Sequence, residues 1–158
     1  QLLDEHVLFD VHPDDSVTPE IAGRFRQVIS PTDHDSEKLP PRVVGLSQFE
    51  APQTVRVSLS KPATLDEMTL HLVNYNRVEP EAKRSAGGGI KDERPIAAEN
   101  IRVDLRMPND VTNNRQVTVV ELLSPEQSEP IKLAFEVREG RLRFVVPSFL
   151  VYGVVRIR

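Results

Sequence analysis

The chain has 158 residues, with 20 Lys and Arg against 24 Asp and Glu, which gives a formal charge of −4. At about 150 residues per domain we expect one domain and room for a short additional segment. The acidic balance argues against a nucleic-acid partner, because such proteins usually carry a basic excess. No stretch approaches the roughly 18 consecutive apolar residues of a membrane-spanning helix, so we expect no membrane partner.

Two further features of the composition restrict the chemistry. Cysteine is absent, which excludes disulfide scaffolds, thiolate metal sites and cysteine nucleophiles but leaves the cellular compartment open. Residues 1–12 have neither a basic start nor an apolar run, and they predict no signal peptide. Because the sequence also lacks an initiator Met, we expect it to be a piece of a larger polypeptide.

Residues 1–44 predict an N-terminal tail and linker with one short helix. Thr18 suits the N-cap, Pro19 the first helical position and Glu20 the positive end of the helix dipole. Apolar residues then follow at helical spacing as far as Ile29, and Pro31 stops the pattern. We therefore predict a mixed segment with a helix over about residues 19–29, followed by a polar linker.

Residues 45–158 predict the main domain, because apolar and polar side chains alternate from residue 53 onward. The candidate strands are 54–59, 68–73, 101–107, 117–123, 131–138, 142–146 and 151–157. The turn at 138–141, with Gly140 available for positive φ, predicts a hairpin. Strands without intervening helices predict an all-β fold, an antiparallel β-sandwich of about seven strands, with a barrel as the second choice. Phe135 is predicted to be a core residue whose truncation to Ala costs about 3 to 5 kcal/mol.

Residues 77–99 form the longest stretch without a strand pattern. A connection of that length inside a compact domain is usually functional or disordered. Its run Gly87–Lys91 (GGGIK) lacks the Gly-Lys-Ser/Thr ending and the strand-to-helix context of a phosphate-binding loop. We therefore interpret it as a flexible loop.

The residues that could carry chemistry form no recognised constellation. Five candidate metal ligands occur in the first segment: His6, His12, Asp33, His34 and Asp35. Their spacing matches no known ligand arrangement. No G-x-S-x-G motif is present, and His71 is interpreted as a hydrogen-bonded structural histidine. The acid pairs at 14–15, 66–67 and 92–93 are interpreted as solvated surface groups rather than glycosidase carboxylates. We assign no catalytic, cofactor-binding or metal-binding residue, and we expect no cofactor.

Basic side chains recur at outward positions of the predicted strands. They are Arg56, Arg102, Arg106, Lys132, Arg138, Arg141, Arg143, Arg156 and Arg158. We expect most of them to pair across strands with Asp104, Glu121 and Glu136, at under about 1 kcal/mol each. Contact with an acidic partner domain is the alternative.

Two segments of the sequence carry a family resemblance. Residues 68–75 (MTLHLVNY) and 145–157 (VVPSFLVYGVVRI) resemble strands of the C-terminal β-sandwich domain that follows the catalytic barrel in several bacterial glycoside hydrolases of the α-amylase and β-galactosidase type. Residues 51–59 (APQTVRVSL) are also similar, and the likeness covers about residues 45–158. It implies a non-catalytic accessory domain that packs on or stabilises an upstream catalytic domain of the same polypeptide. The catalytic acids would lie in that upstream domain.

Within the first of these segments, Asn74 and Tyr75 are expected to close the strand end. The Asn amide can bond neighbouring backbone and the Tyr ring can cover the edge of the core. The alternative function is a carbohydrate- or ligand-binding module that uses the 77–99 loop, and a small hydrolase with an unrecognised site is the third. Against carbohydrate binding, the chain has no Trp and two Tyr, whereas sugar-binding modules present aromatic platforms.

Overall fold

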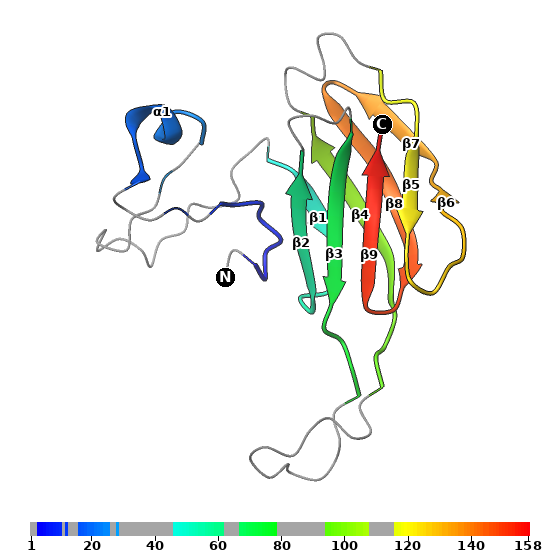
Figure 1. Ribbon diagram of the computed structural model, residues 1–158. Helices are drawn as coiled ribbons and strands as arrows, with labels where there is room; N and C mark the ends of the chain where they lie inside the picture. Colours follow the sequence, from blue (N-terminus) through cyan, green and yellow to red (C-terminus); the bar gives the residue numbers. More distant parts are fainter. Residues whose placement is uncertain are drawn as a thin grey trace, which may run out of the picture. The chain divides into compact units, whose positions relative to one another are not determined.

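The structure, a computed structural model, describes residues 3–10, 12, 16–25, 28, 46–61, 67–78, 94–107 and 116–158. The chain divides into two compact units, one of Gln1–Leu8 with Leu46–Arg158 and the other of Phe9–Gly45. The larger unit is built of β-strands (Figure 1). The boundary between residues 44 and 45 stays a prediction, because both residues lie outside the described ones.

The smaller unit contains a helix that starts as predicted but ends early. α1 (Pro19–Ala22) is capped by the Thr18 side chain, which accepts a 3.3 Å hydrogen bond from a first-turn N–H. The helix stops at Ala22, whereas we expected it to continue to about residue 29. Gly23 follows, and glycine costs roughly 1 kcal/mol inside a helix. The Phe25 N–H then bonds the Ala22 carbonyl, three residues back, at 3.1 Å, so a tighter turn replaces the helical hydrogen-bond pattern.

The first described residues belong to the larger unit, although the sequence assigned them to the N-terminal tail. His6 is 6% exposed, and its Nε2 lies 3.1 Å from the Pro52 carbonyl oxygen. Asp4 forms an ion pair of 2.9 Å with Arg56. A segment this short carries no readable periodicity, so only the folded chain reveals these contacts.

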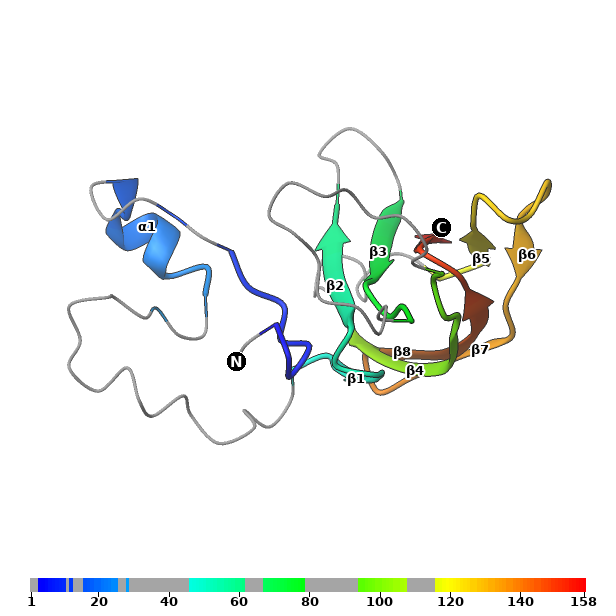
Figure 2. The ribbon, with the colours of Figure 1, turned by 90° about the horizontal axis from the view of Figure 1, so that it is seen from below.

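Two antiparallel sheets face each other in the larger unit (Figure 2). The four-stranded sheet has the order β1 (Gln48–Glu50), β4 (Ala98–Arg106), β8 (Arg141–Phe149), β7 (Phe135–Arg138). The five-stranded sheet has the order β2 (Val55–Ser60), β3 (Met68–Asn74), β9 (Tyr152–Ile157), β5 (Val120–Leu123), β6 (Ile131–Lys132). The predicted antiparallel β-sandwich is confirmed.

The core lies between the sheets and follows from the period-two pattern. In β3 every second residue is buried, and the residues between them are half-buried. Both sheets contribute fully buried aliphatic side chains: Leu70, Leu72, Ile101, Leu105, Leu122, Leu142, Val55, Val120, Val146 and Val155. Each such side chain contributes about 1.5 to 3 kcal/mol by leaving water. The alternation therefore accounts for the apolar core between the two sheets.

The predicted strand 131–138 is divided between the two sheets. Its first part, β6, pairs with β5, and its second part, β7, pairs with β8. Leu133 is buried between them, and its N–H donates to the Val120 carbonyl at 2.8 Å. Phe135 starts β7 and is only partly buried against the core, because β7 is the outermost strand of its sheet. The described residues thus form nine strands, whereas the sequence predicted about seven, and β1 is the other addition.

Strand β8 continues through Pro147 to Phe149, whereas the predicted strand ends at residue 146. Proline has no N–H for the ladder and is tolerated where a strand has lost a neighbour. The pairing of β7 with β8 extends only to Phe144, so β8 has β4 alone beside it at Pro147. On β4, Asn100 adopts a positive φ of 53° in the gap between the paired residues Glu99 and Ile101.

The predicted hairpin between β7 and β8 is confirmed. Glu139 and Gly140 occupy its two-residue turn with φ of 53° and 71°. Positive φ at both positions is the type I′ pattern, whose twist matches that of the adjoining strands. The Gly140 carbonyl also accepts a 2.9 Å hydrogen bond from Met107, which follows β4. The turn thereby joins the ends of three strands.

Candidate functional site

The outer face of the four-stranded sheet carries the arginine face, which we define as Arg102, Arg106, Arg138, Arg141 and Arg143. The strand register places Arg141 directly between two other arginines, one on β4 and one on β7. Like charges in direct opposition destabilise a sheet unless counter-charges lie nearby. The sheet supplies such a counter-charge in the carboxylate of Asp104.

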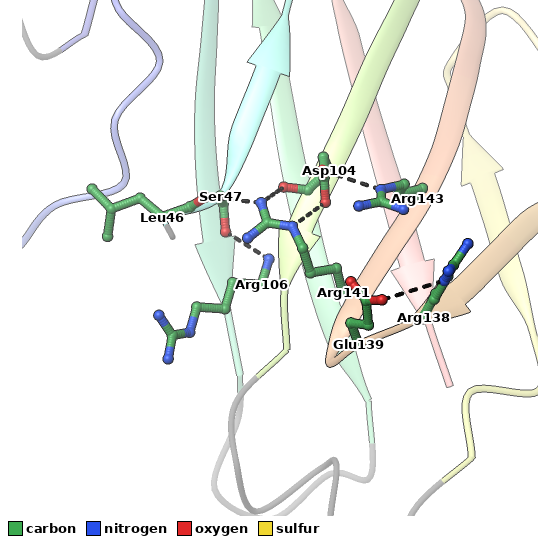
Figure 3. Close-up of polar contacts among 8 residues, drawn as sticks. All are labelled: Leu46, Ser47, Asp104, Arg106, Arg138, Glu139, Arg141 and Arg143. Atoms are coloured by element: carbon green, nitrogen blue, oxygen red, sulfur yellow. Dashed lines mark hydrogen bonds and ion pairs between the residues drawn. The ribbon is translucent and has the colours of Figure 1, made fainter. Parts of the chain in front are cut away.

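Asp104 is held by two arginines from the neighbouring strand (Figure 3). Nε of Arg141 lies 2.6 Å from one carboxylate oxygen, and Nε of Arg143 lies 3.2 Å from the other. Arg141 also donates to the Leu46 carbonyl at 2.9 Å, so it fixes the point where the chain enters the sandwich. The Arg141 side chain is 17% exposed. These contacts confirm the expected cross-strand pairing of Asp104 and give its two arginines a structural role.

A second carboxylate, Glu121 on β5, is paired in the same way on the five-stranded sheet. Its Oε2 accepts hydrogen bonds from Arg156 at 2.7 Å and from Arg158 at 3.1 Å. The hydrogen bond from Arg156 is the main reason that the pKa of Glu121 lies below its ordinary value of 4.5, and the partial burial of the carboxylate opposes this shift. Glu121 is therefore ionised at neutral pH and suited to an ion pair, not to donating a proton.

Asn74, the last residue of β3, organises the end of the sandwich from which the 77–99 connection leaves. The side chain is 4% exposed. Its Nδ2 donates to the carbonyls of Ile96 and Leu150 at 2.7 Å each, and its Oδ1 accepts from the Asn76 N–H at 3.0 Å. One amide thus joins β3 to the segment entering β4 and to the turn between β8 and β9. The expectation for Asn74 is confirmed.

Beyond Asn74 the two ends of the connection pair with each other. Val78 donates to the Arg94 carbonyl at 2.9 Å, and Ile96 donates to the Asn76 carbonyl at 3.0 Å. We call residues 74–78 and 94–97 the connection foot. It leaves the sandwich at the end where β3 ends and the β8–β9 turn lies (Figure 1). Residues 79–93, including Gly87–Lys91, lie outside the described residues.

Exposed apolar side chains gather at this same end. Of the ten large hydrophobic residues exposed in the described part of the chain, five lie on the connection foot or the β8–β9 turn and the first residue of β9: Tyr75, Val78, Ile96, Val151 and Tyr152. Tyr75 is 60% exposed, so the expectation that its ring covers the core edge is wrong. Tyr75 follows the buried Asn74 and lies on the outward side of the sheet.

His71 is hydrogen-bonded, as the sequence predicted. Its partner, the hydroxyl of Tyr152, was not predicted. Nδ1 of His71 and the Tyr152 hydroxyl share a hydrogen bond of 2.7 Å. The two rings are stacked at 24° with centroids 6.2 Å apart. The residues lie on adjacent strands, where Tyr152 is opposite Val73. Alternation along the strands predicts that His71 and Tyr152 both face outward. Only the β3–β9 register shows that they are neighbours.

The other candidate residues that the structure describes have separate partners. His6 bonds the Pro52 carbonyl in the larger unit, while His12 packs edge-on against Phe25 in the smaller one. Residues 33–35, the acid pairs at 14–15 and 92–93, and residue 66 lie outside the described part. Within that part, no three His, Asp or Glu side chains form a metal-binding group. Nor does any described helix have the length and apolar character needed to cross a bilayer.

Part of this chain is similar in fold to parts of known proteins. No family model and no curated protein matches it. Among solved structures it is similar to alpha-L-fucosidase isoenzyme 2 from Paenibacillus thiaminolyticus, with 20% identity and a TM-score of 0.53, over 72% of this chain and 15% of that one. It is also similar to a cycloisomaltooligosaccharide glucanotransferase from Paenibacillus sp., with 17% identity and a TM-score of 0.45, over 65% of this chain and 14% of that one. The chain therefore spans a small part of both enzymes.

Proposed function

We propose that the chain is a non-catalytic accessory domain of a larger, glycoside-hydrolase-like polypeptide, where it packs on or stabilises a catalytic domain. The observation that carries this proposal is the match to 15% of the alpha-L-fucosidase chain, which means that a similar fold occurs as a small part of a much longer enzyme. The resemblance of residues 68–75 and 145–157 to accessory-domain strands agrees with it. The upstream catalytic domain is the partner in this proposal.

The state of two described carboxylates also supports a non-catalytic role. A glycosidase acid needs a raised pKa so that it is protonated near neutral pH. Asp104 and Glu121 are instead each paired with two arginines, and the pKa of Glu121 is lowered. Glu121 is therefore not suited to be a general acid, and both carboxylate oxygens of Asp104 are engaged by arginines. In this proposal the fragment contributes no catalytic residue and takes no cofactor.

The proposal is tested on the polypeptide encoded by the complete reading frame, made with and without residues 46–158. We expect the shortened protein to show a lower Tm or a lower yield of folded enzyme. The 158-residue chain alone should not hydrolyse p-nitrophenyl glycosides. Turnover by the chain alone that one carboxylate substitution abolishes would overturn the proposal, and so would an unchanged Tm and activity after the deletion.

The second candidate function is a ligand-binding module that uses the 77–99 connection, with carbohydrate as the ligand class. The observation that favours it is the connection foot, which buried Asn74 anchors and which presents exposed apolar side chains. Deleting residues 79–93 should then weaken binding to a polysaccharide column without lowering the Tm by more than a few degrees. Retention that is equal before and after the deletion would count against this function.

A further inference from the structure

The chain places both of its tyrosines on one side of one sheet. Tyr152 begins β9 opposite Val73 of β3 on the outer face of the five-stranded sheet. Tyr75 lies two residues beyond Val73, and its N–H donates to the Thr54 carbonyl at 2.9 Å, which continues the β2–β3 ladder. Residues two apart on a strand share a face, so Tyr75 lies on the same side. We call Tyr75, Val73, Tyr152 and His71 the tyrosine face.

The Tyr152 ring of the tyrosine face is held in place before any ligand arrives. The hydrogen bond of 2.7 Å between His71 and Tyr152, with the rings stacked at 24°, holds the Tyr152 ring in one orientation. Tyr152 is nevertheless 37% exposed and Tyr75 is 60% exposed. A fixed, exposed ring loses little side-chain entropy when a ligand settles on it. Such an arrangement favours binding by stacking.

The polar groups around this face point to an uncharged ligand. Arg56 lies on β2 opposite Val73, but its guanidinium is ion-paired with Asp4 at 2.9 Å and donates to the Leu3 carbonyl. That charge is already neutralised within the protein. Ser58, which is exposed and opposite His71, adds a hydroxyl on the same face. The face therefore combines flat apolar rings with a hydrogen-bonding border and little net charge.

We propose that the tyrosine face binds a pyranose ring of a neutral oligosaccharide. A pyranose has a face of C–H groups that can stack on an aromatic ring and a rim of hydroxyls that can bond polar neighbours. This inference rests on the second candidate function and deepens it, because it places the binding residues on the sheet, at the foot of the connection. A binding site of this kind does not require Trp, because two tyrosines and a histidine form its aromatic platform.

Intrinsic fluorescence gives a direct assay, because the chain has no Trp and its two tyrosines both lie on this face. The 158-residue chain is titrated with cellohexaose, xylohexaose, mannohexaose, maltohexaose and laminarihexaose, and Kd is confirmed by calorimetry. We expect at least one of them to change the tyrosine emission in a saturable way. Tyr75→Ala and Tyr152→Ala should each weaken that Kd by about tenfold, while Tyr75→Phe, which keeps the ring, should weaken it less.

Val145→Ala is the matched control. Val145 is an exposed apolar residue on the outer face of the other sheet, 45% exposed, and its truncation should leave Kd unchanged. Thermal unfolding of each variant shows whether it is folded, and Tyr75→Phe preserves the test if Tyr75→Ala is not.

Two results would overturn the proposal in distinguishable ways. Binding that survives both alanine substitutions but is lost on deletion of residues 79–93 would keep the second candidate function and reject the tyrosine face. No change in emission or heat with any of the five hexasaccharides would reject both. Neither result bears on the accessory-domain proposal, which depends on the reading-frame deletion.

Discussion

Replacing Asn74 with Ala should destabilise the protein far more than a change at a strand end normally does. The substitution removes three hydrogen bonds, two donated to carbonyls and one accepted from an N–H. At a net value of about 1 kcal/mol for each bond, the loss is about 3 kcal/mol. The groups left behind are partly reachable by water, because the neighbouring Ile96 is 43% exposed, so the full penalty for unsatisfied buried groups does not apply.

Two companion variants separate hydrogen bonding from packing. Asn74→Asp keeps the volume and the acceptor but loses both donated bonds, so at pH 7 we expect it to be at least as destabilising as Asn74→Ala. Asn76→Ala is the control, because Asn76 contributes its backbone N–H to Asn74 and keeps that group as alanine. It should change stability by less than about 0.5 kcal/mol.

The assay is urea unfolding followed by far-UV circular dichroism. With a slope of about 2 kcal/mol/M, a loss of about 3 kcal/mol lowers the urea midpoint by about 1.5 M. Amide hydrogen exchange at Val78 and Ile96 should also accelerate in Asn74→Ala, because both N–H groups lie in the connection foot. A midpoint shift below about 0.5 M, or wild-type stability in Asn74→Asp, would refute the reasoning that the amide joins the three segments.

Three further predictions concern the core and the two paired carboxylates. Leu142→Ala should cost about 2 to 5 kcal/mol because Leu142 is fully buried, whereas Phe135→Ala should cost about 1 to 2 kcal/mol, since partial burial leaves a smaller cavity; equal urea midpoints would contradict this. The lowered pKa of Glu121 means that its ionised form contributes stability above the ordinary value of 4.5, and this contribution is lost as pH falls through the lower folded pKa. The difference in urea midpoint between wild type and Glu121→Gln should therefore shrink as the pH falls below the ordinary value of 4.5, and a difference that stays constant with pH would refute this prediction. Arg141→Lys should cost about 1 to 2 kcal/mol because a lysine cannot reproduce the fork to a carboxylate and two carbonyls, and the more exposed Arg143→Lys should cost less in the same unfolding assay.

The period-two pattern predicted the class of fold because burial in a sandwich follows strand parity. Leu70 and Leu72 are fully buried, and His71 between them faces outward, as alternation requires. Alternation does not, however, specify which sheet a strand joins. Residues 131–138 keep a period of two on either side of Leu133, so the sequence pattern shows no sign of the change of sheet there.

Short or unusual elements were missed for physical reasons. β1 (Gln48–Glu50) has one buried residue, Phe49, which is too little for any periodicity. Pro147 is a sound turn signal in isolation, and only the early end of β7 makes it acceptable within β8. The predicted helix after Pro19 was too long, because apolar residues at helical spacing continue beyond Gly23, the C-cap at which the helix ends.

The candidate site was partly predictable. Asn74 was identified because an amide at a strand end commonly bonds nearby backbone, although its partners at Ile96 and Leu150 depend on how distant segments meet. The pairing of Asp104 and Glu121 followed from charge alternation on adjacent strands. The His71–Tyr152 contact joins residues 81 positions apart, and it required the β3–β9 register.

The division of residues 131–138 between the sheets has a consequence for self-association. β6 and β7 are outermost strands of their respective sheets, and they are only two and four residues long. An incoming β-strand from another molecule needs a row of free N–H and C=O groups to continue the ladder. On this flank β6 and β7 each offer only a few residues, since the backbone leaves one layer for the other. The edge of β8 that β7 leaves unpaired contains Pro147, which has no N–H to donate. We therefore expect the flank to be a poor template for edge-to-edge aggregation, even in concentrated solution.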